Sequence, residues 1–338
     1  MKSNIKALLA AAGLAAFAFS PANAYEAGYP GWATKPGALI GSSAGVPPPG
    51  IYMFNQVFTY QTNLVGPLTN VIGTHTGVQA AVDVQGFLFV PGWTFLGATY
   101  DAVLVQPFIM AGISGPLNLN PAFAGNISGV HNTYFVPVEL SWKLGTSGFA
   151  VKTGLGIYAP DGTVQGPFGL SNVGNPWWTF IPEVIVSYLA NGWNLTAAFQ
   201  EEFNTKNSVD GYTTGDIFRA DFTVTKTIGK WTFGPVAYYV GQVSNDSCPA
   251  FTCTVAGGTL GNAQRFNLFA VGGLVEYNFG PASLSVWATQ EVIGNAKNAA
   301  VPAAADVSTI TQGMTVFATL SYRIWAPEAP AAAPMIHK

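Results

Sequence analysis

The sequence predicts an all-β fold, an antiparallel transmembrane β-barrel of about twelve strands. Three observations lead to this fold class. The chain begins like an exported protein, it combines few charges with no long apolar run, and its strand-like segments are joined alternately by short and long connections. Together these features favour a barrel of the bacterial outer membrane over a soluble domain or a helical membrane protein.

Residues 1–24 have the features of a cleaved signal peptide. Lys2 and Lys6 form a short positive region, residues 7–19 are uninterruptedly apolar, and Ala22-Asn23-Ala24 supplies a small-residue cleavage site. An apolar run of this length is too short to cross a bilayer as a helix, which needs about 20 residues. We therefore expect export, with a mature chain that begins at Tyr25.

The composition is difficult to reconcile with a soluble domain. Only 9% of the residues are charged although 49% are hydrophobic, whereas soluble domains carry about 25% charged residues. The mature chain contains no apolar run of about 18 residues, so a transmembrane helix is excluded. A barrel resolves the conflict because it places its apolar residues at alternate positions of short strands. The formal net charge of −3 argues against nucleic acid as a partner.

Twelve segments of the mature chain have strand character, with apolar residues at alternate positions. They span residues 50–62, 77–90, 93–111, 130–143, 148–159, 176–189, 192–204, 213–227, 230–244, 263–279, 282–293 and 311–325.

The connections between these segments alternate in length. Five are tight and built from residues that suit hairpin turns, namely Pro91-Gly92, Leu144-Gly145-Thr146-Ser147, Ala190-Asn191, Ile228-Gly229 and Gly280-Pro281. Six are long and rich in Gly, Pro, Asn and Ser, spanning roughly 63–76, 112–129, 160–175, 205–212, 245–262 and 294–310. Outer-membrane barrels have short periplasmic turns and long external loops. Because twelve is even, we expect both chain termini on the periplasmic side.

The last segment shows the expected two faces most clearly. One face carries Met314, Val316, Ala318, Leu320, Tyr322 and Ile324, and the other carries Gly313, Thr315, Thr319, Ser321 and Arg323, with Phe317 as the exception. The first face is expected to meet lipid and the second a polar lumen. Aromatic residues near strand ends, such as Trp93 and Trp142, suit the membrane interface.

Two segments lie outside the predicted barrel of residues 50–325. Residues 25–49 lack periodicity and end in Pro47-Pro48-Pro49, and we expect them in the periplasm or the lumen, where they would act as a plug. Residues 326–338 form a Pro/Ala-rich tail that is expected to be disordered. The final strand ends in Tyr322-Arg323-Ile324-Trp325, similar to the aromatic-ended signal by which the barrel-assembly machinery recognises its substrates, except that the chain continues.

A set of short motifs lies, with gaps, between about residues 45 and 325: Pro48-Pro49-Gly50 with Phe54-Asn55, Gly154 to Gly162, Trp178-Thr179-Phe180 with Pro182, Phe203 to Asn207, Gly215-Asp216, Gly229-Lys230-Trp231 and Tyr238-Tyr239. In these motifs the sequence resembles the outer-membrane transporter family linked to the phenol meta-cleavage degradation pathway. The resemblance implies a location in the outer membrane and a role in the passage of hydrophobic compounds, including aromatic ones.

The alternation assigns a set of charged residues to the lumen. They are Asp83, Asp101, Glu139, Lys152, Glu183, Glu202, Arg219, Asp221, Glu276, Glu291 and Arg323. The acidic excess could form a selectivity ring that disfavours anions. Alternatively, these charges pair across strands and fill a narrow lumen, which is the reading we favour.

The long connections are unusually apolar for an external surface. A hydrophobic solute could be captured there by Ile113, Leu117, Leu119, Phe123, Phe168 and Leu170, or these residues could simply pack together and close the barrel.

The sequence contains no recognisable catalytic site. Cys248 and Cys253 are expected to form a disulfide across the fifth long loop, and no cluster of metal ligands or cofactor motif is present. His75 lies in a long loop, and His131 begins the fourth strand without a nucleophile at a diagnostic spacing.

The favoured hypothesis is a passive channel for small hydrophobic or aromatic solutes, embedded in outer-membrane lipid. Its alternatives are a general diffusion porin for polar solutes and a structural or surface-interaction barrel that transports nothing. We do not expect an enzyme, and the sequence leaves the oligomeric state open.

Overall fold

The computed structural model describes residues 29–67, 69, 77–114, 126–165, 172–247, 264–299, 302, 306 and 308–327. The predicted signal peptide, the Cys248–Cys253 disulfide, His75 and most of the Pro/Ala-rich tail lie outside these residues. Within the described part of the chain, no helix has both the length and the apolar character needed to cross a membrane.

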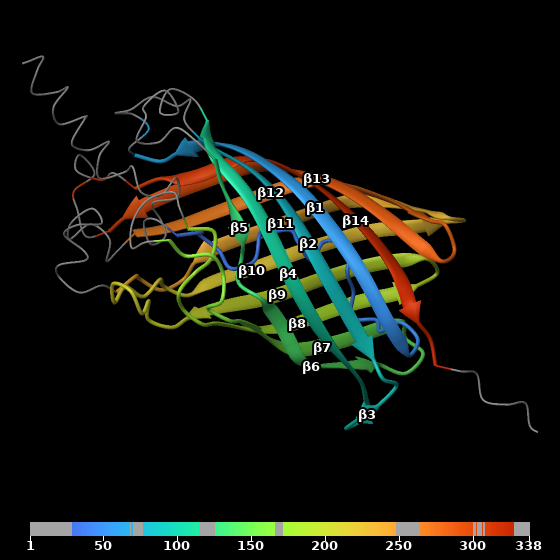
Figure 1. The fold of residues 1–338 in the computed structure, drawn as a ribbon. Coiled ribbons are helices and arrows are strands. Elements are labelled where there is room, and N and C mark those ends of the chain that lie inside the picture. The colour runs from blue at the N-terminus through green and yellow to red at the C-terminus, as the bar shows by residue number, and fades with distance from the viewer. Residues whose placement is uncertain are drawn as a thin grey trace, which may run out of the picture.

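The described residues form one closed antiparallel β-sheet, shown as a barrel in Figure 1. Its strands are β1 (Gly50–Val65), β2 (Gly77–Val90), β3 (Thr94–Phe95), β4 (Ala98–Ser114), β5 (Asn126–Val130), β6 (Tyr134–Lys143), β7 (Phe149–Tyr158), β8 (Thr179–Ala190), β9 (Trp193–Asn204), β10 (Ile217–Ile228), β11 (Trp231–Gln242), β12 (Gln264–Asn278), β13 (Ala282–Asn298) and β14 (Ile310–Trp325).

The barrel wall consists of twelve strands, which confirms the predicted number and fold class. β3 is a two-residue hairpin arm on β4, and β5 and β6 together occupy one position in the wall because both pair with β4. β1 pairs with β14 from Ile51–Trp325 to Val65–Ile310, which closes the sheet. The start of β1 and the end of β14 therefore lie at the same end of the barrel, where the short turns also lie. The orientation of this end relative to the membrane remains a prediction.

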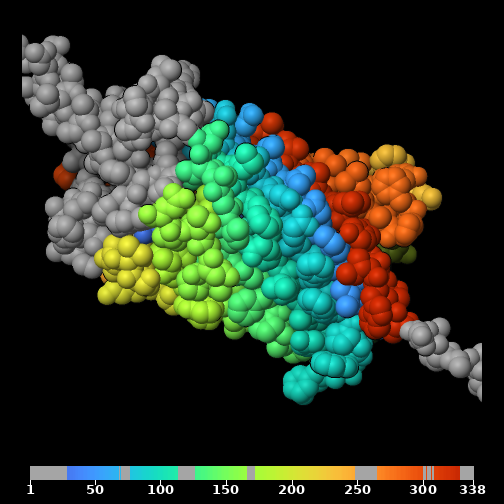
Figure 2. Space-filling model, viewed as in Figure 1, coloured from blue at the N-terminus to red at the C-terminus, as the bar shows by residue number. Residues whose placement is uncertain are grey.

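One predicted tight turn is wrong. Instead of a turn at Pro91-Gly92, residues 91–97 form a longer connection that contains β3. The reversal occurs at Leu96 and Gly97, whose φ angles of 50° and 77° suit a two-residue hairpin turn. In the space-filling view this connection projects beyond the barrel near the end of β14 (Figure 2).

The two faces of each strand differ in polarity over most of the barrel. In β8, the alternate residues Phe180, Val184 and Val186 are 37–45% exposed on the outer surface. Glu183 and Ser187 lie on the opposite face and are buried inside the barrel. This arrangement is the one expected for a wall with lipid outside.

Residues 29–49 run through the interior of the barrel before they enter β1 (Figure 1). Tyr29 packs edge-on against Trp177, next to β8 at the end of the long loops. Gly50 begins β1 at the opposite end. This N-terminal segment therefore crosses the lumen from one end to the other.

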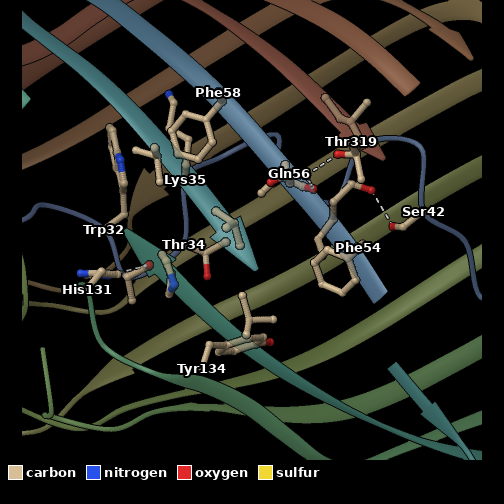
Figure 3. A pocket seen from close by; sticks show the side chains of 18 of the residues that line it. Trp32, Thr34, Lys35, Ser42, Phe54, Gln56, Phe58, His131, Tyr134 and Thr319 are labelled. Atoms are coloured by element: carbon tan, nitrogen blue, oxygen red, sulfur yellow. Dashed lines mark hydrogen bonds between the residues drawn. The ribbon is translucent and has the colours of Figure 1, made fainter. Parts of the chain in front are cut away.

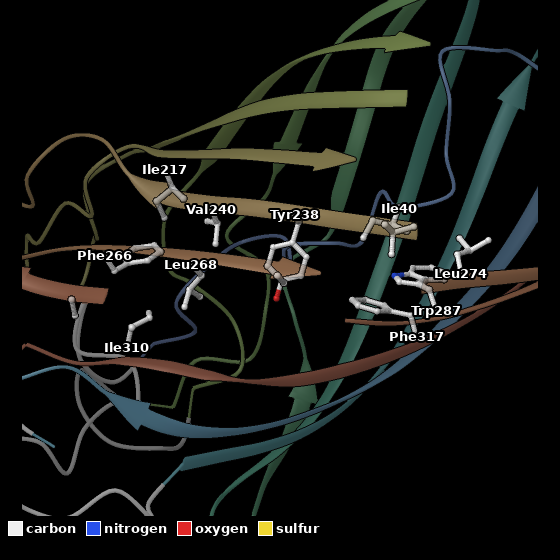
Figure 4. Packing of buried hydrophobic residues seen from close by; sticks show 13 residues of the cluster. Ile40, Ile217, Tyr238, Val240, Phe266, Leu268, Leu274, Trp287, Ile310 and Phe317 are labelled. Carbon is white, nitrogen blue, oxygen red and sulfur yellow. The ribbon is translucent and has the colours of Figure 1, made fainter. Parts of the chain in front are cut away.

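The N-terminal segment packs against a hydrophobic core on the inner wall of β10–β14 (Figure 4). Trp287 and Phe317 stack with their ring planes 9° apart and their centroids separated by 4.8 Å. Ile40 belongs to the same buried cluster. Phe317, the exception to the polar face of the last strand, thus points inward because it packs against Trp287 and Phe58 inside the barrel.

Candidate functional site

A buried ion pair joins the N-terminal segment to β13. Lys35 Nζ lies 3.2 Å from Glu291 Oε1, and both side chains are at most 6% exposed. The Lys35 ammonium group also lies 3.9 Å from the centre of the Tyr60 ring, within the range of a cation–π interaction. Glu291 additionally accepts hydrogen bonds from the Tyr238 hydroxyl and the Gly313 N–H. The carboxylate therefore has partners from β11, β14 and the N-terminal segment.

A second buried pair holds the segment closer to the long loops. Arg219 Nη1 lies 3.0 Å from Glu202 Oε2 and donates to the Thr34 carbonyl at 2.8 Å. Glu202 in turn accepts a hydrogen bond from the Ala33 N–H. Because the two side chains bind each other and the backbone of residues 33 and 34, they fix the path of the segment as well as neutralising each other.

Polar side chains of the wall satisfy the backbone of the segment along the rest of its path. Asp221 accepts hydrogen bonds from the Gly37 and Leu39 N–H groups, each at 3.1 Å. Ser187 accepts one from the Ala44 N–H at 2.8 Å. A segment without secondary structure is stable in a closed interior only if its backbone groups find such partners.

A cavity of about 630 Å³ lies between this segment and the barrel wall, and Figure 3 shows part of it. Its size is within the range of about 300–1,000 Å³ that is usual for small-molecule sites. On the wall side, apolar residues of β1, β2 and β4 dominate the lining: Phe54, Phe58, Val78, Ala80, Val82, Val84, Leu88, Val103, Val105, Ile109 and Ala111. The N-terminal segment supplies Trp32, Thr34, Lys35 and Leu39.

Ionisable side chains line one side of the cavity. Lys152 Nζ lies 3.0 Å from Glu139 Oε2 and 3.3 Å from Asp101 Oδ2. Glu139, Lys152 and Glu183 all line the cavity, and Gln200 donates to Glu183 at 2.9 Å. Lys152 therefore pairs with two buried carboxyl groups, and Glu183 lines the same cavity with Gln200 as its partner.

Most of the predicted lumen charges lie inside the barrel. Asp101, Glu139, Lys152, Glu183, Glu202, Arg219, Asp221 and Glu291 are buried. Glu276 lines the cavity, and Arg323 donates to the Pro49 carbonyl where β1 begins. Nearly all of the buried charges have partners from other strands or from the N-terminal segment, and they do not form an open ring.

The prediction that Asp83 faces the lumen is wrong. Its neighbours Val82 and Val84 line the cavity, so Asp83 lies on the outer face of β2, where it accepts hydrogen bonds from Asn55 and Gln85. Asp83 was predicted on the wrong face because β2 has polar residues on its outer face and apolar residues on its inner face, the opposite of most strands in this barrel. The inner residues of β2 are apolar where they border the cavity.

The predicted capture surface cannot be placed. Leu117, Leu119, Phe123, Phe168 and Leu170 lie outside the described residues, and Ile113 belongs to β4. The sequence did not predict the contacts of Lys35, Ser187 and Tyr238 that hold the N-terminal segment in place. The isolated lysine in an otherwise uncharged stretch, residues 29–49, is the signal that could have identified the Lys35 pair.

At the rim, Asp246 connects two of the long loops. It accepts hydrogen bonds from the Tyr212 hydroxyl at 2.6 Å and from the Gly215 N–H at 2.7 Å. Burial raises the pKa of Asp246 to about 7, although the hydrogen bonds donated by Gly215, Tyr212 and Gln242 act in the opposite direction. The carboxyl group is thus able to change charge near neutral pH.

A closed twelve-stranded barrel with an apolar exterior is the architecture of an outer-membrane β-barrel protein. By its sequence, the chain belongs to the family described as "Putative MetA-pathway of phenol degradation", whose model matches residues 57–305. No curated protein gives a significant match.

Solved structures with a similar fold are distant in sequence. The COG4313 outer membrane channel from Pseudomonas putida F1 is 10% identical, with 83% of this chain and 98% of that chain aligned and a TM-score of 0.67. The β-domain of the Bordetella autotransporter BrkA is 12% identical over 81% of this chain and 100% of that one, with a TM-score of 0.45. The Pseudomonas putida toluene transporter TodX is 10% identical over 91% and 96%, with a TM-score of 0.36.

Proposed function

We propose that this protein is a passive outer-membrane channel for small hydrophobic or aromatic molecules. The observation that carries the proposal is the cavity of about 630 Å³, which has an apolar wall formed by β1, β2 and β4. A solute without charge would gain from contact with this wall. Residues 29–49 act as the plug that narrows the route past the cavity.

The apolar outer surface supports a location in the outer membrane. The short turns lie at the end where β1 starts and β14 ends, which supports a periplasmic position for that end. The predicted signal peptide supports export, and the aromatic residues that end β14 support insertion by the barrel-assembly machinery. Facilitated diffusion down a gradient needs no cofactor. A role for phenol or related aromatic compounds agrees with the description of the family.

A structural role for His131 fits this proposal better than a catalytic one. Its Nδ1 and Nε2 atoms lie 2.6 Å and 3.2 Å from the carbonyl oxygens of Val173 and Ala33, and the side chain is 3% exposed. Both ring nitrogens therefore face the backbone, which leaves neither of them directed at a substrate.

The proposal is tested by solute uptake in intact cells, whose lipopolysaccharide slows hydrophobic compounds. Cells that express the protein should accumulate labelled naphthalene and phenol faster than cells with an empty vector, while the entry of labelled glucose should not change. Equal rates for the aromatic solutes in the two strains would contradict the proposal.

A general diffusion porin is the second candidate, since the carboxyl groups around Lys152 could favour cations. It predicts a large, steady and cation-selective conductance in planar bilayers. The hydrophobic channel predicts a small conductance because the N-terminal segment fills much of the lumen.

A further inference from the structure

Three polar side chains form a cluster on the outer wall of the barrel. Asp83 Oδ1 accepts hydrogen bonds from Asn55 Nδ2 at 2.6 Å and from Gln85 Nε2 at 3.1 Å. Asn55 and Gln85 are directly opposite each other across β1 and β2. We refer to Asn55, Asp83 and Gln85 as the outer polar cluster.

The alternation of the two strands places this cluster outside the barrel. Gln56 donates to Thr319 and to the Ala38 carbonyl in the interior, so its neighbour Asn55 points the other way. Val82 and Val84 line the cavity, so Asp83 and Gln85 also point outward. Apolar side chains surround the cluster on the same face, including Val57 and Phe108, each 43% exposed.

The cluster lies deep within the wall and not at its edge. Asp83 is near the middle of β2. A rise of about 3.3 Å per residue and a tilt of about 40° place it roughly 18 Å from the short-turn end of that strand. Other outward charges, such as Glu201, Lys226 and Arg265, lie close to strand ends. Among the described residues, Asp83 is therefore the outward-facing charged residue that lies deepest in the lipid-facing apolar band. This band is about 25 Å tall in outer-membrane barrels.

The internal hydrogen bonds leave part of the cluster unsatisfied. Among the described residues, the side-chain carbonyl groups of Asn55 and Gln85 accept no hydrogen bond, and lipid tails could not supply a donor. Each copy of the cluster offers both acceptors and amide donors. It can therefore be satisfied by an identical cluster on a second molecule, in a two-fold arrangement.

We propose that β1, β2 and β4 form the contact face of a homodimer in the membrane, centred on the outer polar cluster. In this dimer the amide groups of one copy donate to the side-chain carbonyl groups of Asn55 and Gln85 in the other, while Asp83 of each copy holds its own amide groups in place. Apolar residues such as Val57 and Phe108 pack around them. The inference rests on the membrane location proposed above but not on solute uptake, so a barrel that transports nothing could still dimerise.

Photo-crosslinking in isolated outer membranes tests this interface. Benzoylphenylalanine is introduced at Val57, beside the cluster, or at Val184, a matched outward position on β8 that is 45% exposed. Two copies with different affinity tags are expressed together. After irradiation, the Val57 variant should give an adduct that carries both tags, and the Val184 variant should give little. Asp83→Leu in the Val57 background should lower the yield about threefold or more.

The Asp83→Leu substitution also distinguishes a dimer interface from a cluster that only stabilises the fold of the barrel. Asp83→Leu should leave the heat-modifiable mobility of the folded barrel intact, because the cluster lies on the outer wall and holds no part of the interior. If Asp83→Leu does not fold, Gln85→Leu replaces it and should lower the crosslink yield in the same way. An adduct with an unrelated protein, equal adducts at Val57 and Val184, or no adduct at Val57 would overturn the proposal.

Discussion

Lys35 of the N-terminal segment and Glu291 of β13 are 3.2 Å apart in the interior of the barrel. This contact joins residues that are far apart in the sequence and connects a segment without regular structure to the wall. Since Glu202, Arg219 and Asp221 hold neighbouring parts of the same segment, the position of the N-terminal segment depends on a few buried polar contacts.

Replacement of Lys35 should therefore loosen the plug. Lys35→Met leaves Glu291 buried with two of its partners, Tyr238 and Gly313, and should destabilise the barrel by about 3 kcal/mol, the lower end of the range for a broken buried pair. We expect a higher single-channel conductance in planar bilayers. Lys226→Met, which alters a lysine stacked on Trp193 at the short-turn end, is the control and should leave the conductance unchanged. Unchanged conductance in Lys35→Met would show that the pair does not position the plug.

The stacked pair of Trp287 and Phe317 should contribute strongly to stability. Trp287 is 2% exposed and lies in the hydrophobic core beside Ile40, so Trp287→Ala should cost about 3–5 kcal/mol. Urea unfolding in lipid vesicles measures this difference. Trp231→Ala removes a tryptophan that is 52% exposed and should cost clearly less. Equal losses in the two variants would contradict an interior core.

Asp246 should make the stability of the barrel rim dependent on pH. The pKa of its carboxyl group is about 7 in the folded protein and near 4 in an unfolded chain, so the folded state binds the extra proton between these values. The stabilisation is complete below about pH 4 and is lost as the pH rises toward 7, with an upper limit of about 4 kcal/mol.

Asp246→Asn removes this titration and keeps a side chain of the same shape. The urea midpoint of the wild type should fall between pH 5 and pH 8 by more than that of the variant. An identical pH dependence of the two proteins would mean that Asp246 does not titrate in this range.

Particular residues show where sequence reasoning succeeded. The alternation of apolar and polar residues in β8, β10 and β14 reflects lipid on one side and a polar interior on the other. For that reason the strands, their number and the burial of charges such as Glu183 and Arg219 could be predicted. The parity of the short turns predicted that β1 starts where β14 ends.

The failure at Asp83 has a physical cause. In β2 the inner residues Val82 and Val84 border an apolar cavity, and the outer residues include Asp83 and Gln85, so the rule that polar residues face the lumen gives the wrong side. The path of residues 29–49 through the barrel could not be predicted from the sequence either. Its contacts are made by backbone groups, as with Gly37 and Leu39 on Asp221, and leave no periodic pattern in the sequence.

The cavity on the β2 side is the centre of the functional account, and a pair of adjacent residues tests it most directly. Val82 lines the cavity, whereas Ala81 lies next to it on the exposed outer face of the same strand. Val82→Trp should fill part of the cavity, and Ala81→Trp should only add an apolar side chain on the lipid side. The measurement is the initial rate of labelled naphthalene uptake by intact cells that contain equal amounts of folded barrel. Val82→Trp should show a marked loss of uptake and Ala81→Trp wild-type uptake, and equal rates in the two variants would contradict passage through the cavity.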